Sequence, residues 1–321
     1  MEPAVLYPPI EPYDAGFLDV GGGHELYWET CGNPEGRPAL YLQSVPGGGC
    51  GPVHRRLFDP DAYRLVMFDQ RNSGQSRPHA GDPVADLTTN TTAHTIGDIE
   101  RLRELLGIDR WLLFGGGWGS ALALAYGQEH PERATGFVLR GVRLYLPNAE
   151  AWFLGAAGVA RLYPEIWEAF RLAIPEAERS DLMNAYARLL ADPDPAVHLP
   201  AARAWILWED VTSTLIPREP EEDEDARSLL AVARVENHYF RNGFFLQPAQ
   251  LLRGVSAISH LPAVIINGRY DLLTPPDAAW RLHQAWPGSD LHLVPAAGHS
   301  FDEPGILERL VQATDAFAAE T

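Results

Sequence analysis

Three segments of the sequence carry residue types that could perform nucleophilic catalysis on a carbonyl group. The first is a glycine-rich turn at 115–119, preceded by an apolar run at 111–114 and followed by small and apolar residues. This order is typical of the G-x-S-x-G elbow, where a sharp turn between a strand and a helix exposes a serine. Gly115 and Gly119 occupy the two glycine positions, but Gly117 stands where the serine is expected.

The other two segments supply an acid and a base. Asp271 comes just after the strand-like run "VIINGRYD", and His299 follows the next such run, "LHLVPAAGHS". A carboxylate in the first loop would hold the imidazole of the second in the required tautomer and stabilise its protonated form. Nucleophile, acid and histidine then occur in an order known from one class of α/β enzymes. The sequence therefore predicts a catalytic site at position 117, Asp271 and His299.

Alternating strands and helices must position these residues. An amphipathic pattern at 91–107 has apolar residues at helical spacing and stops at Gly107. Four β-rich runs that end in loops surround it, at 38–45, 63–71, 111–117 and 134–142. This alternation predicts an α/β fold with a mostly parallel sheet covered on both faces.

The pattern changes between Pro147 and Pro248, where tryptophans and long helical patterns replace the strand-like runs. Strand-like runs resume after this region, and an amphipathic helix pattern closes the chain. We therefore expect a core formed by residues 1–146 and 249–321, with residues 147–248 inserted as a helical cap.

Composition restricts the partners and the compartment. The 321 residues include 25 basic and 43 acidic side chains, for a formal net charge of −18, which argues against nucleic acid or an anionic membrane as partner. No run of about 18 apolar residues is present, and the N-terminus lacks the features of a signal peptide. With only Cys31 and Cys50 available, a cytoplasmic protein is expected. No metal or cofactor is expected, since no zinc-binding or phosphate-binding motif occurs.

Seven segments together resemble the proline iminopeptidases, which are serine peptidases of the α/β-hydrolase fold. They are "FDQRNSGQS" (68–76), "NTTAHTIGDIERLRELLGI" (90–108), "GGGWGSALALAYGQEHPE" (115–132), "WEDVTSTLIP" (208–217), "RVENHYFRNGFF" (234–245), "INGRYDLLTP" (266–275) and "HLVPAAGHSFDEPGI" (292–306). The resemblance implies a hydrolase core with a helical cap and a triad at position 117, Asp271 and His299. It also implies aminopeptidase activity, the release of an N-terminal residue, typically proline, from small peptides or amides.

An aminopeptidase must recognise a free α-ammonium group, and desolvated carboxylates can do so through charge-assisted hydrogen bonds. The resemblance assigns this task to Glu236 and Glu209, which lie in the expected cap. Aromatic neighbours could form an apolar wall for a proline-like ring. They are Trp205, Trp208, Tyr239 and Phe240. The expected partner is therefore a small peptide or an amine-bearing small molecule.

Two departures from the family pattern fall on the reacting centre. The family elbow reads G-G-S-W-G-S, and here Gly117 removes its serine. The family loop H-G-G-P-G, which helps to form the oxyanion hole, is replaced by "QSVPG" at 43–47. The expected oxyanion donors are the backbone N–H groups of Trp118 and Val45. Loss of a triad member removes a factor on the order of 10⁶ from turnover, so hydrolysis by the serine route is expected to be negligible.

Other nucleophiles and other reactions remain open. Ser44 and Cys50 lie on the altered loop and could attack instead, the thiol only if its pKa is lowered. Ser120 lies within the first turn of the helix after the elbow. Water activated by an Asp271–His299 dyad would suit an ester or a proton transfer of the lyase or isomerase type. The alternative function is therefore a diverged non-peptidase homologue, which either binds a small molecule or uses the dyad. Two losses at one site favour natural divergence over a single inactivating substitution.

Overall fold

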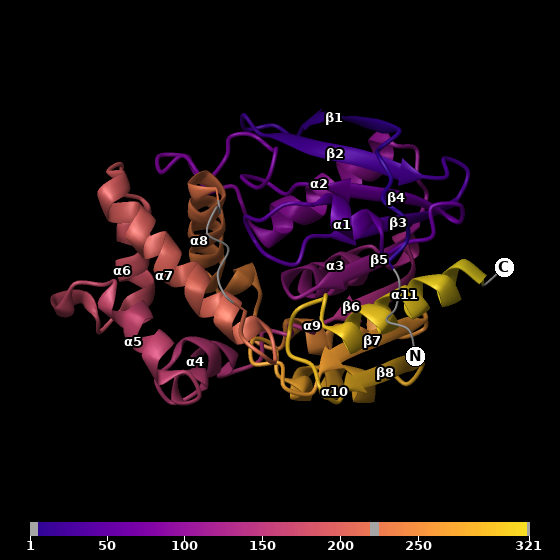
Figure 1. Ribbon diagram of the computed structural model, residues 1–321. Helices are drawn as coiled ribbons and strands as arrows, with labels where there is room; N and C mark the ends of the chain where they lie inside the picture. Colours follow the sequence, from indigo (N-terminus) through magenta and orange to yellow (C-terminus); the bar gives the residue numbers. More distant parts are fainter. Residues whose placement is uncertain (1–5, 219–224, 320–321) are drawn as a thin grey trace.

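The computed structural model describes residues 6–218 and 225–319. Its centre is a sheet of eight strands in the order β1-β2-β4-β3-β5-β6-β7-β8 (Figure 1). The strands are β1 (Asp14–Asp19), β2 (Glu25–Gly32), β3 (Arg37–Leu42), β4 (Tyr63–Phe68), β5 (Trp111–Gly116), β6 (Ala134–Arg140), β7 (Ala263–Gly268) and β8 (Ser289–Val294). β1 and β4 each pair with β2 in antiparallel fashion, and all other neighbours are parallel.

Helices connect these strands. The α-helices are α1 (Pro52–Arg55), α2 (Thr92–Leu105), α3 (Trp118–Glu129), α4 (Ala149–Leu154), α5 (Pro164–Leu172), α6 (Leu182–Leu190), α7 (Pro195–Ser213), α8 (Ala226–Arg241), α9 (Gln250–Arg253), α10 (Pro276–Ala285) and α11 (Pro304–Ala319). Short 3₁₀ helices are η1 (Pro131–Arg133), η2 (Val159–Arg161), η3 (Glu176–Glu178), η4 (Gly243–Phe245) and η5 (Val255–Ala257).

Both faces of the sheet are buried, because successive side chains of a strand point to opposite sides. In β5, Trp111 and Leu113 belong to a core shared with α2, α3 and α10, whereas Leu112 and Phe114 belong to a core shared with α11. This confirms the predicted α/β fold with a mostly parallel, doubly covered sheet, the architecture of an α/β hydrolase. The antiparallel pair β1–β2 was not predicted and extends the sheet at one edge.

A helical insertion separates β6 from β7, as the sequence predicted. Helices α4 to α8 gather on one side of the sheet, away from both described chain ends (Figure 1). We propose that the cap extends over residues 147–248, since α4 begins at Ala149 and α9, which packs on α3, begins at Gln250.

The fold brings five distant segments to one edge of the sheet. The carboxyl ends of parallel strands meet at the same edge, and the strand order reverses direction around β3 and β5. The loops that follow these strand ends carry Gln43, Gly117, Arg143, Asp271 and His299. The cap helices α7 and α8 approach this edge, so a site enclosed by core and cap is formed there (Figure 1).

Candidate active site

Gly117 forms a sharp turn between β5 and α3, with a φ of 51° and a ψ of −118°. Its N–H group donates to the carbonyl oxygen of Arg140 at 2.9 Å. Its own carbonyl accepts a hydrogen bond of 2.7 Å from Oγ of Ser120, which in turn accepts from the backbone N–H of Arg143 at 3.0 Å. The turn has the shape expected of a nucleophile elbow, and Ser120 is buried and committed to holding it.

Asp271 and His299 meet as the sequence predicted. Oδ2 of Asp271 lies 2.8 Å from Nδ1 of His299, and its Oδ1 accepts hydrogen bonds from the backbone N–H groups of Leu273 and Thr274. Burial alone would raise the pKa of Asp271, but its hydrogen bonds with His299 and Thr274 outweigh burial and lower that pKa. Asp271 is therefore an ionised carboxylate that orients the imidazole.

Arg140 faces the other nitrogen of the imidazole. Its Nη1 lies 2.9 Å from Nε2 of His299 and 2.8 Å from the His299 carbonyl oxygen. Because a guanidinium can only donate, Nε2 must accept, and Nδ1 carries the proton toward Asp271. Burial lowers the pKa of His299, and the charge of Arg140 lowers it further, against the raising effect of Asp271. The imidazole is thus neutral, in the tautomer of a general base, with its lone pair held by Arg140.

The oxyanion hole differs from the expectation. The backbone N–H of Trp118, one of the two predicted donors, donates instead to the carbonyl oxygen of Ser44 at 3.0 Å. A Cβ atom on Gly117 would lie only 2.9 Å from that same oxygen. The hydrogen bond of 3.0 Å from the Gln43 side chain goes to the carbonyl oxygen of Val45 and does not involve its N–H, the other predicted donor. The altered loop therefore places a carbonyl group against the elbow, where the Trp118 N–H would bind a substrate oxygen.

The alternative nucleophiles are poorly placed. Burial raises the pKa of Cys50 well above its ordinary value, with the charge of Asp69 adding to the effect. Its Sγ donates to the carbonyl oxygen of Phe68 at 3.3 Å, so Cys50 lacks the lowered pKa that nucleophilic attack would require. Ser44 does line the cleft, next to Gly117 and His299.

Two cap glutamates face this site from opposite helices. Glu209 of α7 and Glu236 of α8 line a cleft of about 240 Å³ together with Gly117 and His299. Burial also raises the pKa of Glu209, and the two carboxyl groups lie close enough to affect each other's protonation. Burial and the Glu209 charge raise the pKa of Glu236 well above its ordinary value, and Trp205 Nε1 donates to Glu236 Oε2 at 2.8 Å. The pair is a desolvated anionic site suited to an ammonium group.

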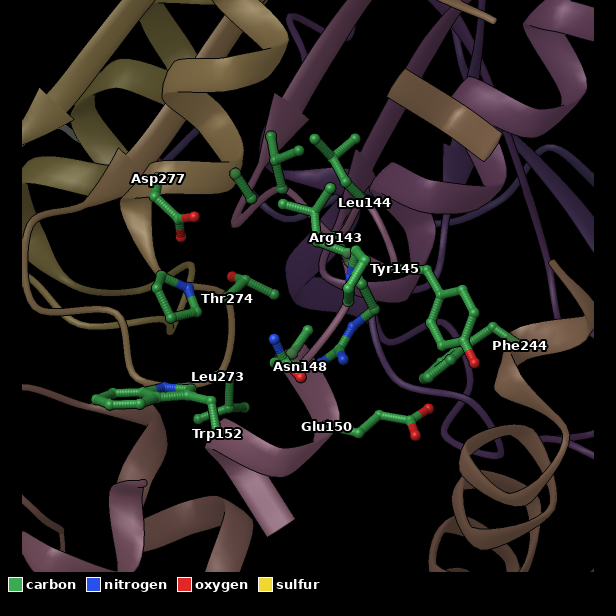
Figure 2. Close-up of a pocket in the computed structure, with 16 residues that line it drawn as sticks. Arg143, Leu144, Tyr145, Asn148, Glu150, Trp152, Phe244, Leu273, Thr274 and Asp277 are labelled. Carbon is green, nitrogen blue, oxygen red and sulfur yellow. The ribbon is translucent and has the colours of Figure 1, made fainter. Parts of the chain in front are cut away.

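A second cavity of about 300 Å³ adjoins the cleft on the side of α4 and α10. Arg143 and Phe244 line both spaces, and Figure 2 shows the Arg143 side chain reaching into the second cavity. No sequence motif assigned a role to Arg140 or Arg143. Arg140 is the last residue of β6 and Arg143 lies three residues later, so their place at the carboxyl end of a parallel strand was the signal that could have identified them.

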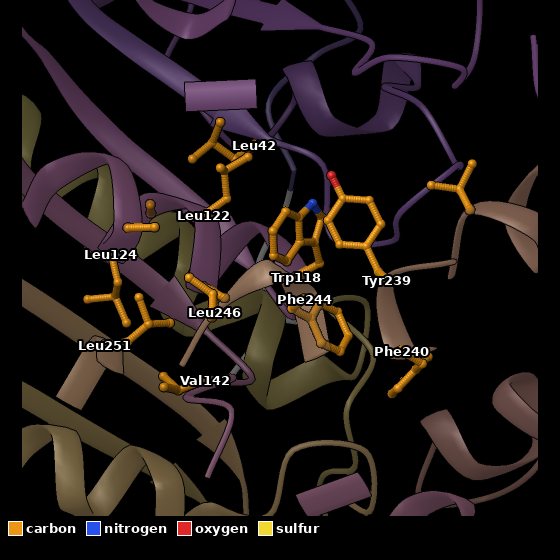
Figure 3. Packing of buried hydrophobic residues seen from close by; sticks show 14 of the residues in the cluster. Leu42, Trp118, Leu122, Leu124, Val142, Tyr239, Phe240, Phe244, Leu246 and Leu251 are labelled. Atoms are coloured by element: carbon orange, nitrogen blue, oxygen red, sulfur yellow. The ribbon is translucent and has the colours of Figure 1, made fainter. Parts of the chain in front are cut away.

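The aromatic wall is only partly as expected. Figure 3 shows Tyr239 packed against Trp118 and Phe244, and its hydroxyl donates to Asn90 Oδ1 at 2.9 Å. Trp208 is also buried and lies within the aromatic packing of the cap. Neither Tyr239 nor Trp208 is among the residues that line the cleft. Of the four expected aromatic residues Phe240 lines it, together with Phe244, which was not predicted.

The part of the chain that the structure describes offers neither a metal-binding cluster nor a membrane-spanning helix. Within residues 6–218 and 225–319, no three His, Cys, Asp or Glu side chains cluster so that they could hold a metal ion. No helix in the same ranges has both the length and the apolar character needed to cross a membrane.

Comparisons with known proteins agree with the fold. The pattern of the alpha/beta hydrolase fold family matches residues 47–302. Among solved structures, a putative aryl esterase from Burkholderia cenocepacia superposes with a TM-score of 0.63 at 18% identity, covering 95% of this chain and 99% of its own. A proline iminopeptidase-related protein from Thermus thermophilus gives a TM-score of 0.58 at 23% identity, covering 95% and 97%. At these identities the likeness concerns the fold alone.

Sequence relatives are much closer. Proline iminopeptidase from Xanthomonas citri is 50% identical over 319 residues, covering 98% of this chain and 99% of the relative. Proline iminopeptidase from Arabidopsis thaliana is 49% identical over 318 residues, covering 98% and 82%. Identity at this level over nearly the whole length shows the family: the chain belongs to the proline iminopeptidase family of α/β hydrolases.

Proposed function

We propose that this protein binds small amine-bearing ligands of the prolyl type in the cleft between core and cap, and that it does not hydrolyse them by the serine route. The ammonium group would bind to the Glu209–Glu236 pair, with Phe240 and Phe244 against the apolar ring. The small-peptide substrates implied by the names of the relatives support this ligand class.

The position of the Ser44 carbonyl carries this proposal. It accepts the Trp118 N–H at 3.0 Å and would lie 2.9 Å from any Cβ at position 117. The loop at 43–47 and the glycine are therefore adapted to each other, because a side chain at 117 would press on the loop. Such mutual adaptation supports divergence of the whole centre rather than one lost hydroxyl.

A hydrolase that lacks only its serine is the competing interpretation. Under that interpretation Gly117→Ser should restore activity, since Cβ at 117 lies 3.3 Å from His299 Nε2 and a hydroxyl could reach the base. A lyase or esterase that uses the dyad is disfavoured by Arg140, which donates to the same Nε2 at 2.9 Å.

The test compares four proteins in assays with prolyl chromogenic amides and in calorimetry with L-prolinamide. We expect the unaltered chain to bind prolinamide without hydrolysing the amides, and Glu236→Gln to lose binding. Gly117→Ser alone should gain little activity, because the oxyanion donor stays occupied. Gly117→Ser combined with Gln43→His, Ser44→Gly and Val45→Gly should gain on the order of 10³-fold over Gly117→Ser.

Two results would overturn the proposal. One is hydrolysis by the unaltered chain that is lost on Asp271→Asn. The other is full recovery by Gly117→Ser alone, which would mean that the Ser44 carbonyl does not obstruct the oxyanion hole.

A further inference from the structure

Arg143 separates the amine-binding cleft from the neighbouring cavity. Its backbone is fixed by the hydrogen bond from its N–H to Ser120 Oγ at 3.0 Å, directly behind the elbow. Its side chain lines both the cleft with the glutamate pair and the second cavity, where Asn148 and Glu150 also contribute polar groups (Figure 2). A ligand that fills either space would therefore contact its guanidinium.

The guanidinium is held in place without being hydrogen-bonded. It lies 5.5 Å from the ring centre of Phe240 and 5.2 Å from that of Phe244, within the range of cation–π attraction. Within the described ranges, no group accepts a hydrogen bond from its side-chain nitrogen atoms. Its five N–H donors face the two cavities, where oxygen atoms of a ligand could accept from them.

The surrounding carboxyl groups favour the charged form of Arg143, but none of them accepts a hydrogen bond from its side chain. Burial lowers the pKa of Arg143, and nearby Glu209, Glu236, Asp271 and Glu150 act against this change. Asp271 is hydrogen-bonded to His299, and Glu236 accepts a hydrogen bond from Trp205. Glu150 has its pKa raised by burial, and its Oε1 is buried without a hydrogen-bond partner.

We infer that the natural ligand is a zwitterion, whose ammonium binds the Glu209–Glu236 pair and whose carboxylate binds Arg143. This inference rests on the proposed function and narrows its ligand class. The chemistry fits a free α-amino or α-imino acid, or a short peptide with a free carboxylate. A guanidinium presents parallel N–H groups that match the two oxygens of a carboxylate, so one group satisfies several donors at once.

A carboxylate also suits a centre without a nucleophile. The ligand would place its ammonium against the glutamate pair and its carboxylate against Arg143, so that groups of opposite charge face each other. Leu144, Leu273 and Trp152 give the second cavity an apolar wall for the remainder of a ligand. A bound amino acid has no peptide bond to cleave, so loss of the serine costs such a protein nothing.

Calorimetry with three probes tests the inference on the unaltered protein. L-Proline carries both charges, L-prolinamide carries only the ammonium, and N-acetyl-L-proline carries only the carboxylate. We expect L-proline to bind roughly ten- to hundredfold more tightly than L-prolinamide, and N-acetyl-L-proline to bind more weakly than both. Prolyl-glycine and its C-terminal amide, measured in the same way, distinguish a dipeptide from a free imino acid.

Variants assign the preference to one side chain. Arg143→Met should bring the affinities for L-proline and L-prolinamide to within about threefold, and Arg143→Lys should retain part of the difference. Arg188→Met is the matched control, because Arg188 lies on α6 of the cap and pairs with Glu178 at the surface. It should leave the preference unchanged.

The outcomes separate the inference from the proposed function. Equal binding of L-proline and L-prolinamide by the unaltered protein overturns the inference alone, provided that prolinamide binding still depends on Glu236. A preference that survives Arg143→Met also overturns it. If none of the probes binds, both proposals fail. The comparison on the unaltered protein decides the question even if Arg143→Met does not fold.

Discussion

Residue 117 has a backbone conformation that is costly for any residue with a side chain. Its φ of 51° and ψ of −118° lie outside the regions that L-residues favour, and a Cβ would meet the Ser44 carbonyl at 2.9 Å. We predict that Gly117→Ala lowers the free energy of unfolding by about 1–3 kcal/mol, measured by urea denaturation.

Gly97→Ala is the control for that measurement. Gly97 lies inside α2 with ordinary dihedral angles and nothing within 4 Å of its added Cβ. Alanine should stabilise the helix there by about 0.5–1 kcal/mol. If Gly97→Ala lowered the free energy of unfolding as much as Gly117→Ala, the elbow conformation would not be the cause of the destabilisation.

The charge of Arg140 affects two histidines. Burial is the main cause that lowers the pKa of His54 to about 4, and Arg140 adds to it. Between about pH 6.5 and 4 the unfolded chain would bind a proton at His54 that the folded chain does not bind. The free energy of unfolding is therefore expected to fall as the pH falls through this window, measured by urea denaturation at a series of pH values.

Arg140→Met should raise the pKa values of both His54 and His299, because one positive charge leaves their surroundings. Titration of the imidazole signals by NMR measures this directly, and the pH dependence of stability should shrink in parallel. Unchanged pKa values for both rings would contradict the charge argument and leave burial as the sole cause.

Single residues of the site could be predicted only where a motif or a resemblance marked them. Asp271 and His299 follow strand-like runs, and the resemblance pointed to the two glutamates, which the structure brings into one cleft. Arg143 could not be predicted in this way, because its importance depends on which groups three separate elements place around it. The loop at 43–47 was recognised as altered, but the direction of its Ser44 carbonyl depends on tertiary packing.

At the scale of elements, periodicity predicted the sheet strands of the core and the helices between them. It missed β1, an exposed edge strand whose pairing with β2 depends on a distant chain segment. A continuous helical pattern in the first part of the cap is broken in the structure, since α4 ends at Leu154 and α5 begins only at Pro164. Gly155 ends α4, where it is extended and where a Cβ would clash with the Ala151 carbonyl oxygen. Pro164 begins α5, since proline is favoured in the first helical turn.

The pairing of α7 with α8 positions the glutamates. Trp205 of α7 donates from Nε1 to Oε2 of Glu236 at 2.8 Å, which lowers the pKa of that glutamate against the raising effect of burial. We predict that Trp205→Phe weakens binding of L-prolinamide by roughly tenfold, because the carboxyl group loses a charge-assisted donor. Calorimetry measures the change.

Trp167→Phe provides the comparison for Trp205. Trp167 packs against Trp208 with ring centres 5.3 Å apart, within the same aromatic cluster of the cap, and lines neither cavity. Its replacement should affect stability but leave prolinamide affinity within about twofold. Equal losses of affinity in the two variants would assign the effect to cap packing and not to the hydrogen bond.

At the scale of the whole molecule, hydrogen bonds connect the cap to the loop that carries His299. The carbonyl oxygen of Ser213, the last residue of α7, accepts hydrogen bonds from the backbone N–H groups of His299 at 2.7 Å and Ser300 at 2.9 Å. Leu215 donates its N–H to Glu303 Oε1 at 2.6 Å. One helix therefore carries Glu209 into the cleft and holds the backbone of His299, so the glutamate pair and the dyad are positioned together.

Gly298 makes this junction possible and tests it. A Cβ at 298 would lie 2.8 Å from the Leu215 nitrogen and 2.9 Å from the Ser213 oxygen, both backbone atoms of the cap. We predict that Gly298→Ala lowers the free energy of unfolding by about 1–3 kcal/mol and weakens prolinamide binding, because the end of α7 must move away. Hydrogen exchange should accelerate at the amides of His299 and Ser300.

Gly288→Ala is the control, because the nearest atom to an added Cβ there is 4.0 Å away, and it should change none of these quantities. If the two amides stay protected in Gly298→Ala while stability falls, the cap and the dyad are not coupled through this junction.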